Sequence, residues 1–303
     1  MPVIGLLSPA TTQSYQQTGP GYPGPELMRA SLAKQGLIDG ENIRLEVRLA
    51  EGKLDRLPEL AEALVREGAR VILAFGEAAA RAAQAATNTI PIVCGGDDLV
   101  NSGLAASLGK PGSNVTGVSM LATELDEKKI EVLKELLPKA KYFGVLNDPT
   151  TAGLGRVRAM TETARSLGVA LQVIDVHGAD DIATAFKALQ AGGAEGVNVA
   201  SSPLLAGLRE RVGEASLQVK IPAICQWRYM VEVGCLASYG TTPDHFYALE
   251  AQQAARLLRG AKPEELPVQQ PTKFELVINL KTAQALGLTV PQALLLRADE
   301  VIE

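Results

Sequence analysis

Short apolar runs alternate along the chain with longer segments whose apolar residues recur at helical spacing. The short runs are rich in β-branched residues and are bounded by glycine, proline or small polar residues, as buried strands usually are. They predict strands at Val3–Leu7, Ile43–Arg48, Val71–Phe75, Ile92–Cys94, Tyr142–Leu146, Leu171–Val176, Gly196–Val199, Ala223–Cys225, Leu236–Tyr239 and Phe274–Ile278.

The longer segments are amphipathic, with charged residues on the side opposite the apolar ones. Several are followed by a glycine where a helix would end in a left-handed residue, as at Gly36, Gly68 and Gly168. They predict helices at Leu54–Glu67, Glu77–Ala86, Glu124–Leu137, Leu154–Leu167, Ile182–Gln190, Leu204–Leu217, Phe246–Leu258 and Thr282–Leu286.

The order of these elements predicts an open α/β sheet, because most strands are apolar on both faces and alternate with helices. The rhythm breaks in 97–120, which is rich in glycine, asparagine, serine and proline, and a new series begins after it. We therefore expect two doubly wound α/β lobes with parallel sheets and a ligand cleft between them. The predicted domains are 1–118 with about 241–271, and 119–240 with about 272–303.

Composition narrows the class of protein. Hydrophobic residues make up 47% of the 303 residues, enough for a full core, and the formal net charge of −5 argues against a nucleic-acid partner. No apolar window reaches about 18 residues, so no membrane-spanning helix is expected. The first residues have no basic segment followed by a long apolar one, so either the protein is cytoplasmic or a leader has been removed.

The histidines and cysteines predict no metal site. His177, His245, Cys94, Cys225 and Cys235 lie too far apart for the common zinc spacings or for a disulfide framework. The cysteines lie in or beside apolar strands, so we expect buried thiols. A bridge between Cys225 and Cys235 is the alternative.

Catalytic motifs are missing from the sequence. It has no nucleophile elbow, no phosphate-binding loop and no dinucleotide-binding glycine pattern after a strand. With no histidine base and no lysine after a strand, few residues are left for catalysis. We predict a binding protein without cofactor, metal or catalytic residue.

Ligands of open α/β sheets bind at the carboxyl ends of the strands. The residues that follow the predicted strands are small, polar or aromatic, with few carboxylates. The ligand-binding candidates are Ser8, Tyr15, Gly76, Glu77, Ala78, Asp97, Asp98, Asn147, Asp148, Ser201, Ser202, Gln226, Trp227 and Tyr239.

These candidates suit a zwitterion such as an amino acid. Free backbone N–H groups at two helix starts would hold a carboxylate, an aspartate would hold an ammonium group, and aromatic rings would enclose an apolar side chain. Each also has a purely structural interpretation: a capped helix start, an ordinary turn, or a core tryptophan. Arg228 is either a ligand contact or a partner in a surface ion pair.

Four segments resemble one known family. The run Pro271–Pro291 (PTKFELVINLKTAQALGLTVP) is similar to the C-terminal signature of ABC-transporter substrate-binding proteins described as tryptophan/tyrosine transport components. Ala50–Pro58, Lys110–Gly117 and Ser238–Gly240 match the same family in the same order.

The resemblance implies a periplasmic-binding-protein fold with three crossovers and a cycle in which the lobes close on a ligand. It also implies a monomer that delivers a small solute, an amino acid first, to a membrane permease with a separate ATPase. Such proteins are periplasmic or otherwise extracytoplasmic, which favours a removed leader. Glu77 stands where relatives carry a small residue, which favours a cationic or hydroxyl group of the ligand.

Two other classes of protein share this fold. A ligand-sensing domain of a regulatory or signalling system is the alternative, although no helix-turn-helix segment precedes Val3. An α/β enzyme is the third hypothesis, and it would need a nucleophile or base that the sequence does not supply.

Overall fold

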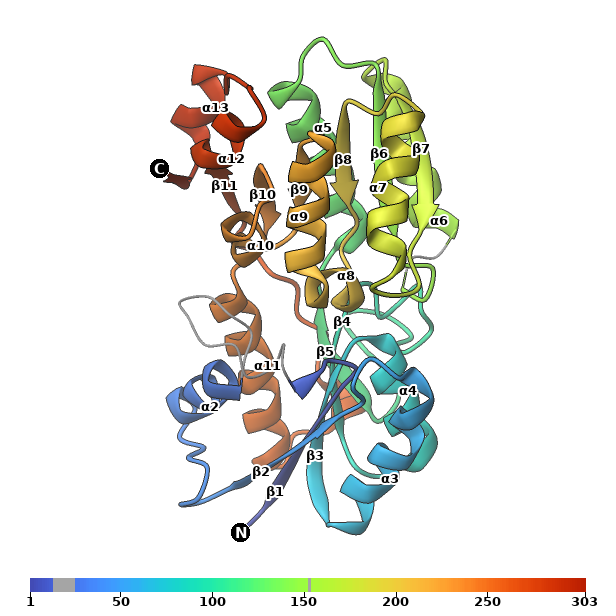
Figure 1. Ribbon diagram of the computed structural model, residues 1–303. Helices are drawn as coiled ribbons and strands as arrows, with labels where there is room; N and C mark the ends of the chain where they lie inside the picture. The colour runs from blue at the N-terminus through green and yellow to red at the C-terminus, as the bar shows by residue number, and fades with distance from the viewer. Residues whose placement is uncertain (13–24, 152–153) are drawn as a thin grey trace. The chain divides into compact units, whose positions relative to one another are not determined.

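The computed structural model describes residues 1–12, 25–151 and 154–303 (Figure 1). These residues form two compact units. The first unit comprises Met1–Leu121 and Pro243–Thr272, and the second comprises Ala122–Thr242 and Lys273–Glu303. The chain therefore passes from one unit to the other three times.

The first unit contains a five-stranded sheet in the order β2-β1-β3-β4-β5, with every pair parallel. Strands β1 and β4 are buried along their whole length, and β3 is buried except at Arg70 and Phe75, because helices cover both faces. Edge strand β2 (RLEVRL) is more exposed, and only Leu45 in it is buried. The strands are β1 (Val3–Ser8), β2 (Arg44–Leu49), β3 (Ala69–Phe75), β4 (Ile92–Gly96) and β5 (Val115–Ser119).

Helices α3 and α4 pack against each other on one face of this sheet, and α11 covers β3, β4 and β5 on the other face beside α2 (Figure 1). Two short 3₁₀ helices complete the unit. The bounds are α2 (Pro25–Lys34), η1 (Leu54–Arg56), α3 (Leu57–Arg66), α4 (Glu77–Ala86), α11 (Pro243–Leu258) and η2 (Pro263–Glu265).

The second unit contains a seven-stranded sheet in the order β12-β11-β10-β9-β8-β6-β7. Its pairs are parallel except β10 with β11, which are antiparallel. The strands are β6 (Tyr142–Asn147), β7 (Ala170–Asp175), β8 (Gly196–Val199), β9 (Ala223–Cys225), β10 (Ala237–Gly240), β11 (Glu275–Asn279) and β12 (Glu300–Ile302).

Helix α5 packs against α6 and lies on β8, β9 and β10, while α7 packs against α9. Short helices follow several of the later strands. The bounds are α5 (Ala122–Leu136), α6 (Leu154–Ser166), α7 (Asp181–Ala191), α8 (Pro203–Gly207), α9 (Arg209–Val219), α10 (Arg228–Glu232), α12 (Leu280–Ala285) and α13 (Gln292–Arg297).

The predicted α/β class with two mostly parallel sheets is confirmed, but several elements differ from the prediction. The antiparallel strand β11 was expected to be parallel, because an apolar pattern does not encode strand direction. The single helix predicted over Leu204–Leu217 is two helices, α8 and α9, which meet at Leu208. Strand β12 and helices α2, α10 and α13 were not predicted.

Strand β5 was not predicted either, because it lies inside the segment expected to connect the lobes. Its sequence VTGVS is short and partly polar, which hides it from an apolar pattern. Thr116 Oγ1 donates to the carbonyl of Leu266 at 2.7 Å, which satisfies the buried hydroxyl. Gly117 is needed because its φ is +149° and a Cβ there would meet the carbonyl oxygen of Cys94 at 2.0 Å.

Cys225 and Cys235 form a disulfide, so the expectation of three free thiols was wrong. Cys225 ends β9 and Cys235 precedes the neighbouring strand β10, so the short connection through α10 brings their Cα atoms within 6.5 Å. Cys94 is a free, buried thiol. Burial, followed by the nearby acidic groups of Glu77, Glu250 and Asp97, raises its pKa well above the usual value.

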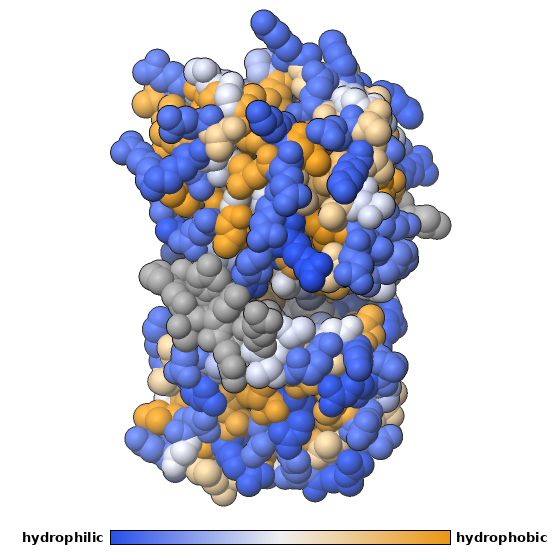
Figure 2. Space-filling view, in the orientation of Figure 1, coloured by the Kyte–Doolittle hydropathy of each residue, from blue (hydrophilic) through white to orange (hydrophobic). Residues whose placement is uncertain are grey.

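Among the residues that the structure describes, no helix combines the length and the apolar content needed to cross a membrane. Hydrophilic residues cover most of the face of each unit shown in Figure 2, and apolar residues lie between them in smaller groups.

Candidate functional site

In the first unit, β1, β3 and β4 are neighbours and run parallel, so Ser8, Gly76 and Asp97 follow or end strands at one edge of the sheet. The Ser8 hydroxyl accepts the N–H of Ala10 at 3.1 Å. The N–H of Gly76 donates to the carbonyl of Gly95 at 2.8 Å, which fixes the start of α4 against β4.

Helix α4 begins at this edge without a side-chain cap, because the residue before it is Gly76, with φ of +83°. Glu77 is its first residue and Ala78 its second. The Glu77 carboxylate accepts the N–H of Asp98 at 3.3 Å, which joins two predicted ligand residues 21 positions apart. The start of α4 therefore has no side-chain cap and carries one carboxylate.

The Asp98 carboxylate is engaged in a local turn, as its structural interpretation predicts. Its Oδ1 accepts the N–H groups of Val100 and Asn101 at 3.1 and 3.0 Å, and its Oδ2 accepts the Asn101 side-chain amide at 2.6 Å. Three bonds leave little capacity for a ligand ammonium group. Asp97 is buried, and its carbonyl accepts the hydroxyl of Ser119, a residue of β5 outside the predicted site.

The second unit brings Asp148 and Ser202 together from the ends of β6 and β8. The Ser202 hydroxyl donates to Asp148 Oδ2 at 2.6 Å and accepts the N–H groups of Leu204 and Leu205, so it caps α8. Asp148 Oδ1 accepts the backbone N–H of Thr150 at 2.9 Å and its hydroxyl at 2.6 Å. Both side chains are buried.

Asn147 carries an unused acceptor beside this pair. Its Nδ2 donates to Asp175 Oδ1 at 2.7 Å, while its buried Oδ1 has no hydrogen-bond partner among the described residues. The buried hydroxyl of Thr241, just after β10, also has none there. Leaving a buried polar group unsatisfied costs free energy, so these positions suit donors and acceptors from a bound molecule or water.

Aromatic side chains lie just after β9 and within β10. The rings of Trp227 and Tyr229 stack with centroids 6.0 Å apart at 11°, and the Arg209 guanidinium lies 5.5 Å from the Tyr229 centroid. Tyr239 stacks with Phe274 at 6.2 Å and 18°.

Gln226 and Tyr15 are two further predicted ligand residues. Gln226, which directly follows β9, is buried. Tyr15 lies outside the described residues.

Arg228 forms ion pairs, as the structural interpretation of this residue predicted. Its Nε and Nη2 contact the two carboxylate oxygens of Glu300 at 2.6 and 2.7 Å, and its Nη1 contacts Glu232. Hydrogen bonding to Glu300 raises the pKa of the guanidinium. Arg228 therefore ties α10 to β12.

Sequence reasoning missed the buried charges beneath Ser201. Asp126 and Lys129 on α5 and Arg156 on α6 form one cluster with the backbone of this loop. The available signal was position: Asp126 and Lys129 fall within the apolar stripe of α5, next to Leu125 and Ile130, rather than on its polar side.

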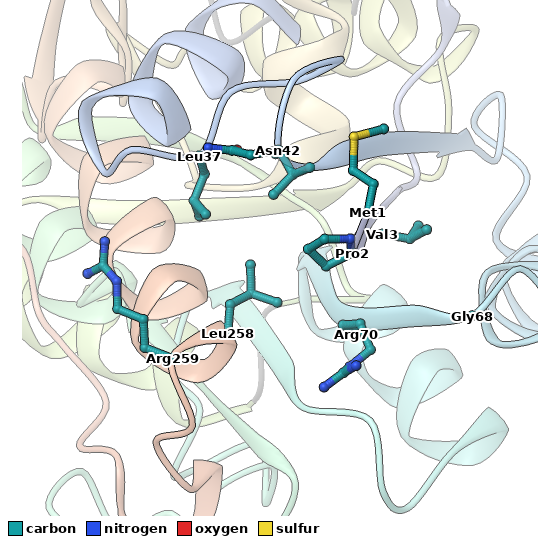
Figure 3. A pocket seen from close by; sticks show the side chains of 10 residues that line it. Met1, Pro2, Val3, Leu37, Asn42, Gly68, Arg70, Leu258 and Arg259 are labelled. Carbon is teal, nitrogen blue, oxygen red and sulfur yellow. The ribbon is translucent and has the colours of Figure 1, made fainter.

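A hollow of about 710 Å³ lies elsewhere in the first unit, where β1 and β3 begin (Figure 3). Met1, Leu37 and Leu258 line it together with Arg70 and Arg259. Ligands of such sheets bind where the parallel strands end. The hollow lies where they begin, so it is at the opposite edge of the sheet from the predicted site. None of the predicted ligand residues lines it. No group of metal-binding side chains was found among the described residues.

The sequence and the fold both match known proteins. The model of the family described as ABC transporter substrate binding protein matches residues 27–302. A curated tyrosine-binding protein of Clostridioides difficile (strain R20291) is 27% identical over 260 residues, covering 85% of this chain and 74% of that protein.

Two solved structures cover 99% of this chain and 99% of their own. A conserved domain protein from Vibrio cholerae O1 biovar eltor is 27% identical with a TM-score of 0.90. An ABC domain in complex with L-Trp from Streptococcus pneumonia is 25% identical with a TM-score of 0.87.

Proposed function

The chain belongs to the ABC transporter substrate-binding protein family, and from this premise we propose that it binds an amino acid, with aromatic amino acids first. The relatives described as tyrosine-binding and as bound to L-Trp support this choice of ligand. The observation that carries it is the buried, unpartnered Asn147 Oδ1 beside the Asp148–Ser202 pair. An amide oxygen at the end of a buried strand is a suitable acceptor for a ligand ammonium group.

The other candidates supply what the rest of an aromatic amino acid needs. The start of α4, which no side chain caps, is placed to hold a carboxylate. The Trp227 and Tyr239 rings offer apolar faces for a side chain. We propose that one ligand contacts both units and so favours a closed state, because a ligand shifts an equilibrium only toward the state it binds better.

We further propose that the protein works outside the cytoplasm and delivers its ligand to a membrane permease with a separate ATPase. The Cys225–Cys235 disulfide supports this location, since structural disulfides persist in oxidising compartments. Cells that lack the protein should lose uptake of the labelled amino acid at low concentration. Unchanged uptake in such cells would contradict the delivery role.

A thermal-shift screen of purified protein against amino acids tests the ligand. A ligand at 100 times its dissociation constant adds roughly 2.7 kcal/mol of stability, which is easily detected. We expect L-tryptophan or L-tyrosine to raise the melting temperature of the wild type. We expect tryptamine, which lacks the carboxylate, and indole-3-propionate, which lacks the ammonium group, to have little effect.

Two variants locate the site. Asn147→Ala should clearly reduce the shift, because it removes the free acceptor at the end of β6. Arg70→Ala, which alters the exposed wall of the hollow in Figure 3, should leave the shift unchanged. The reverse pattern would place the ligand in the hollow and contradict the proposed site.

A further inference from the structure

Three charged side chains are buried together in the second unit. The side chains of Asp126 and Lys129 are 0% exposed and that of Arg156 is 4% exposed. Lys129 Nζ lies 2.7 Å from Asp126 Oδ1, and Arg156 Nε and Nη2 lie 2.5 Å from Asp126 Oδ2. Burial alone would raise the pKa of the Asp126 carboxyl, but Arg156 and Lys129 more than offset this, so its pKa lies below the usual value.

The same three side chains hold the loop that follows β8. Asp126 Oδ1 accepts both the N–H and the hydroxyl of Ser201 at 3.1 Å. Arg156 Nη2 donates to the carbonyl of Ser201 at 2.5 Å, and Lys129 Nζ donates to the carbonyl of Val199 at 2.5 Å. The backbone N–H and the carbonyl of Ser201 are therefore both held by the cluster, together with the carbonyl of Val199.

Stability alone gives a weak reason for such a cluster. Removing charges from water costs several kcal/mol per ion, and replacing a buried ion network by apolar side chains is often neutral or stabilising. Directional bonds to a backbone, by contrast, allow only one loop conformation. The loop in question sets the position of Ser202, whose hydroxyl bonds Asp148 and caps α8.

We propose that Asp126, Lys129 and Arg156 are positioning residues that hold the Val199–Ser202 loop in its ligand-binding conformation. The inference rests on the proposed function, because it assigns the cluster a role in affinity. The cluster itself does not contact the ligand. Its effect reaches the ligand through Ser201 and Ser202.

Two substitutions test the role. Asp126→Asn removes the shared acceptor charge, and it leaves two buried cations. Lys129→Met is the milder change, since it leaves the Asp126–Arg156 pair intact with no net charge, although it removes the ion pair of Lys129 with Asp126 and its bonds to Val199 and Ser201. Ser216→Ala is the matched control, because Ser216 is a buried serine of the same unit whose hydroxyl donates to Ile221 at 2.7 Å.

Hydrogen exchange of the 199–205 amides without ligand is measured together with the affinities for L-tryptophan and L-tyrosine. We expect each cluster variant that folds to speed exchange in this loop and to weaken the affinity, each at least about tenfold, while Ser216→Ala does neither. A lower melting temperature with wild-type loop exchange would overturn the proposal. So would faster loop exchange with wild-type affinity.

The ligand assignment and the positioning role of the cluster are contradicted by different results. If the wild type binds neither amino acid, the ligand assignment fails, and loop exchange alone then decides whether the cluster fixes the loop. Wild-type exchange in Lys129→Met would show that it does not.

Discussion

Glu250 lies on α11 with both carboxyl oxygens buried and without a hydrogen-bond partner among the described residues. It faces Gly95 and lies near the Cys94 thiol, and a Cβ at Gly95 would meet its Oε1 at 2.3 Å. Burial raises the pKa of this carboxyl group well above 4.5. The folded state therefore keeps the proton at pH values where the unfolded chain has lost it, so stability falls as pH rises through that window.

Glu250→Gln removes this titration. As pH rises from about 4.5 to the pKa of Glu250 in the folded state, the wild type should lose stability and the variant should not. The difference in their free energies of unfolding should grow by up to about 1.4 kcal/mol per pH unit. Urea unfolding at a series of pH values measures the difference. Glu41→Gln, at an exposed loop position of the same unit, should follow the wild-type profile. Parallel profiles for Glu250→Gln and the wild type would contradict the buried, protonated carboxyl.

Single residues were predictable where their roles are local. Asp98 accepts bonds from Val100 and Asn101 within its own turn, as aspartates in turns commonly do, and Ser202 caps the helix that Pro203 begins. The partners of Ser201 were not predictable, because Asp126 and Arg156 come from helices 75 and 45 residues away in sequence. A charged residue on a helix is usually solvated, so only its place within an apolar stripe distinguishes Asp126.

At the scale of elements, strands with two buried faces were the most predictable. A short, mostly apolar run such as β1 or the core of β3 is typical of a strand that is buried on both faces. Two short strands were not predicted: β5 depends on a glycine that lets it approach β4, and β12 pairs only through three residues. The direction of β11 was not predicted either, because its apolar pattern is the same for a parallel and an antiparallel strand.

The Cys225–Cys235 disulfide closes the segment that carries Gln226, Trp227 and α10. Replacing both cysteines by serine should cost about 2–4 kcal/mol, because the cross-link restricts the unfolded chain. Reductant should lower the melting temperature of the wild type and leave that of the double variant unchanged.

Thiol counting checks the same bridge in the protein taken from its own cells. Of three cysteines, one should react after denaturation without reductant and three after reduction, since two are paired. Three reactive thiols without reductant would contradict both the bridge and the proposed extracytoplasmic location.

At the scale of the whole molecule, the alternation of strands and helices was enough to predict two α/β units with parallel sheets, and only the β10–β11 pair differs among the described strands. The family signature at Pro271–Pro291 predicted what composition and spacing alone do not, namely the type of transport protein. Neither source identifies the ligand, because a few side chains at strand ends decide it. Those side chains acquire their hydrogen bonds only when distant strands meet.

Isothermal titration of the purified, ligand-stripped protein with L-tryptophan and L-tyrosine tests the central claim most directly. We predict that at least one of them binds at one site per chain, and that Asn147→Ala weakens this binding at least about tenfold, the equivalent of one lost hydrogen bond of roughly 1.4 kcal/mol. Absence of heat and of a melting shift for every aromatic amino acid at millimolar concentration would contradict the account.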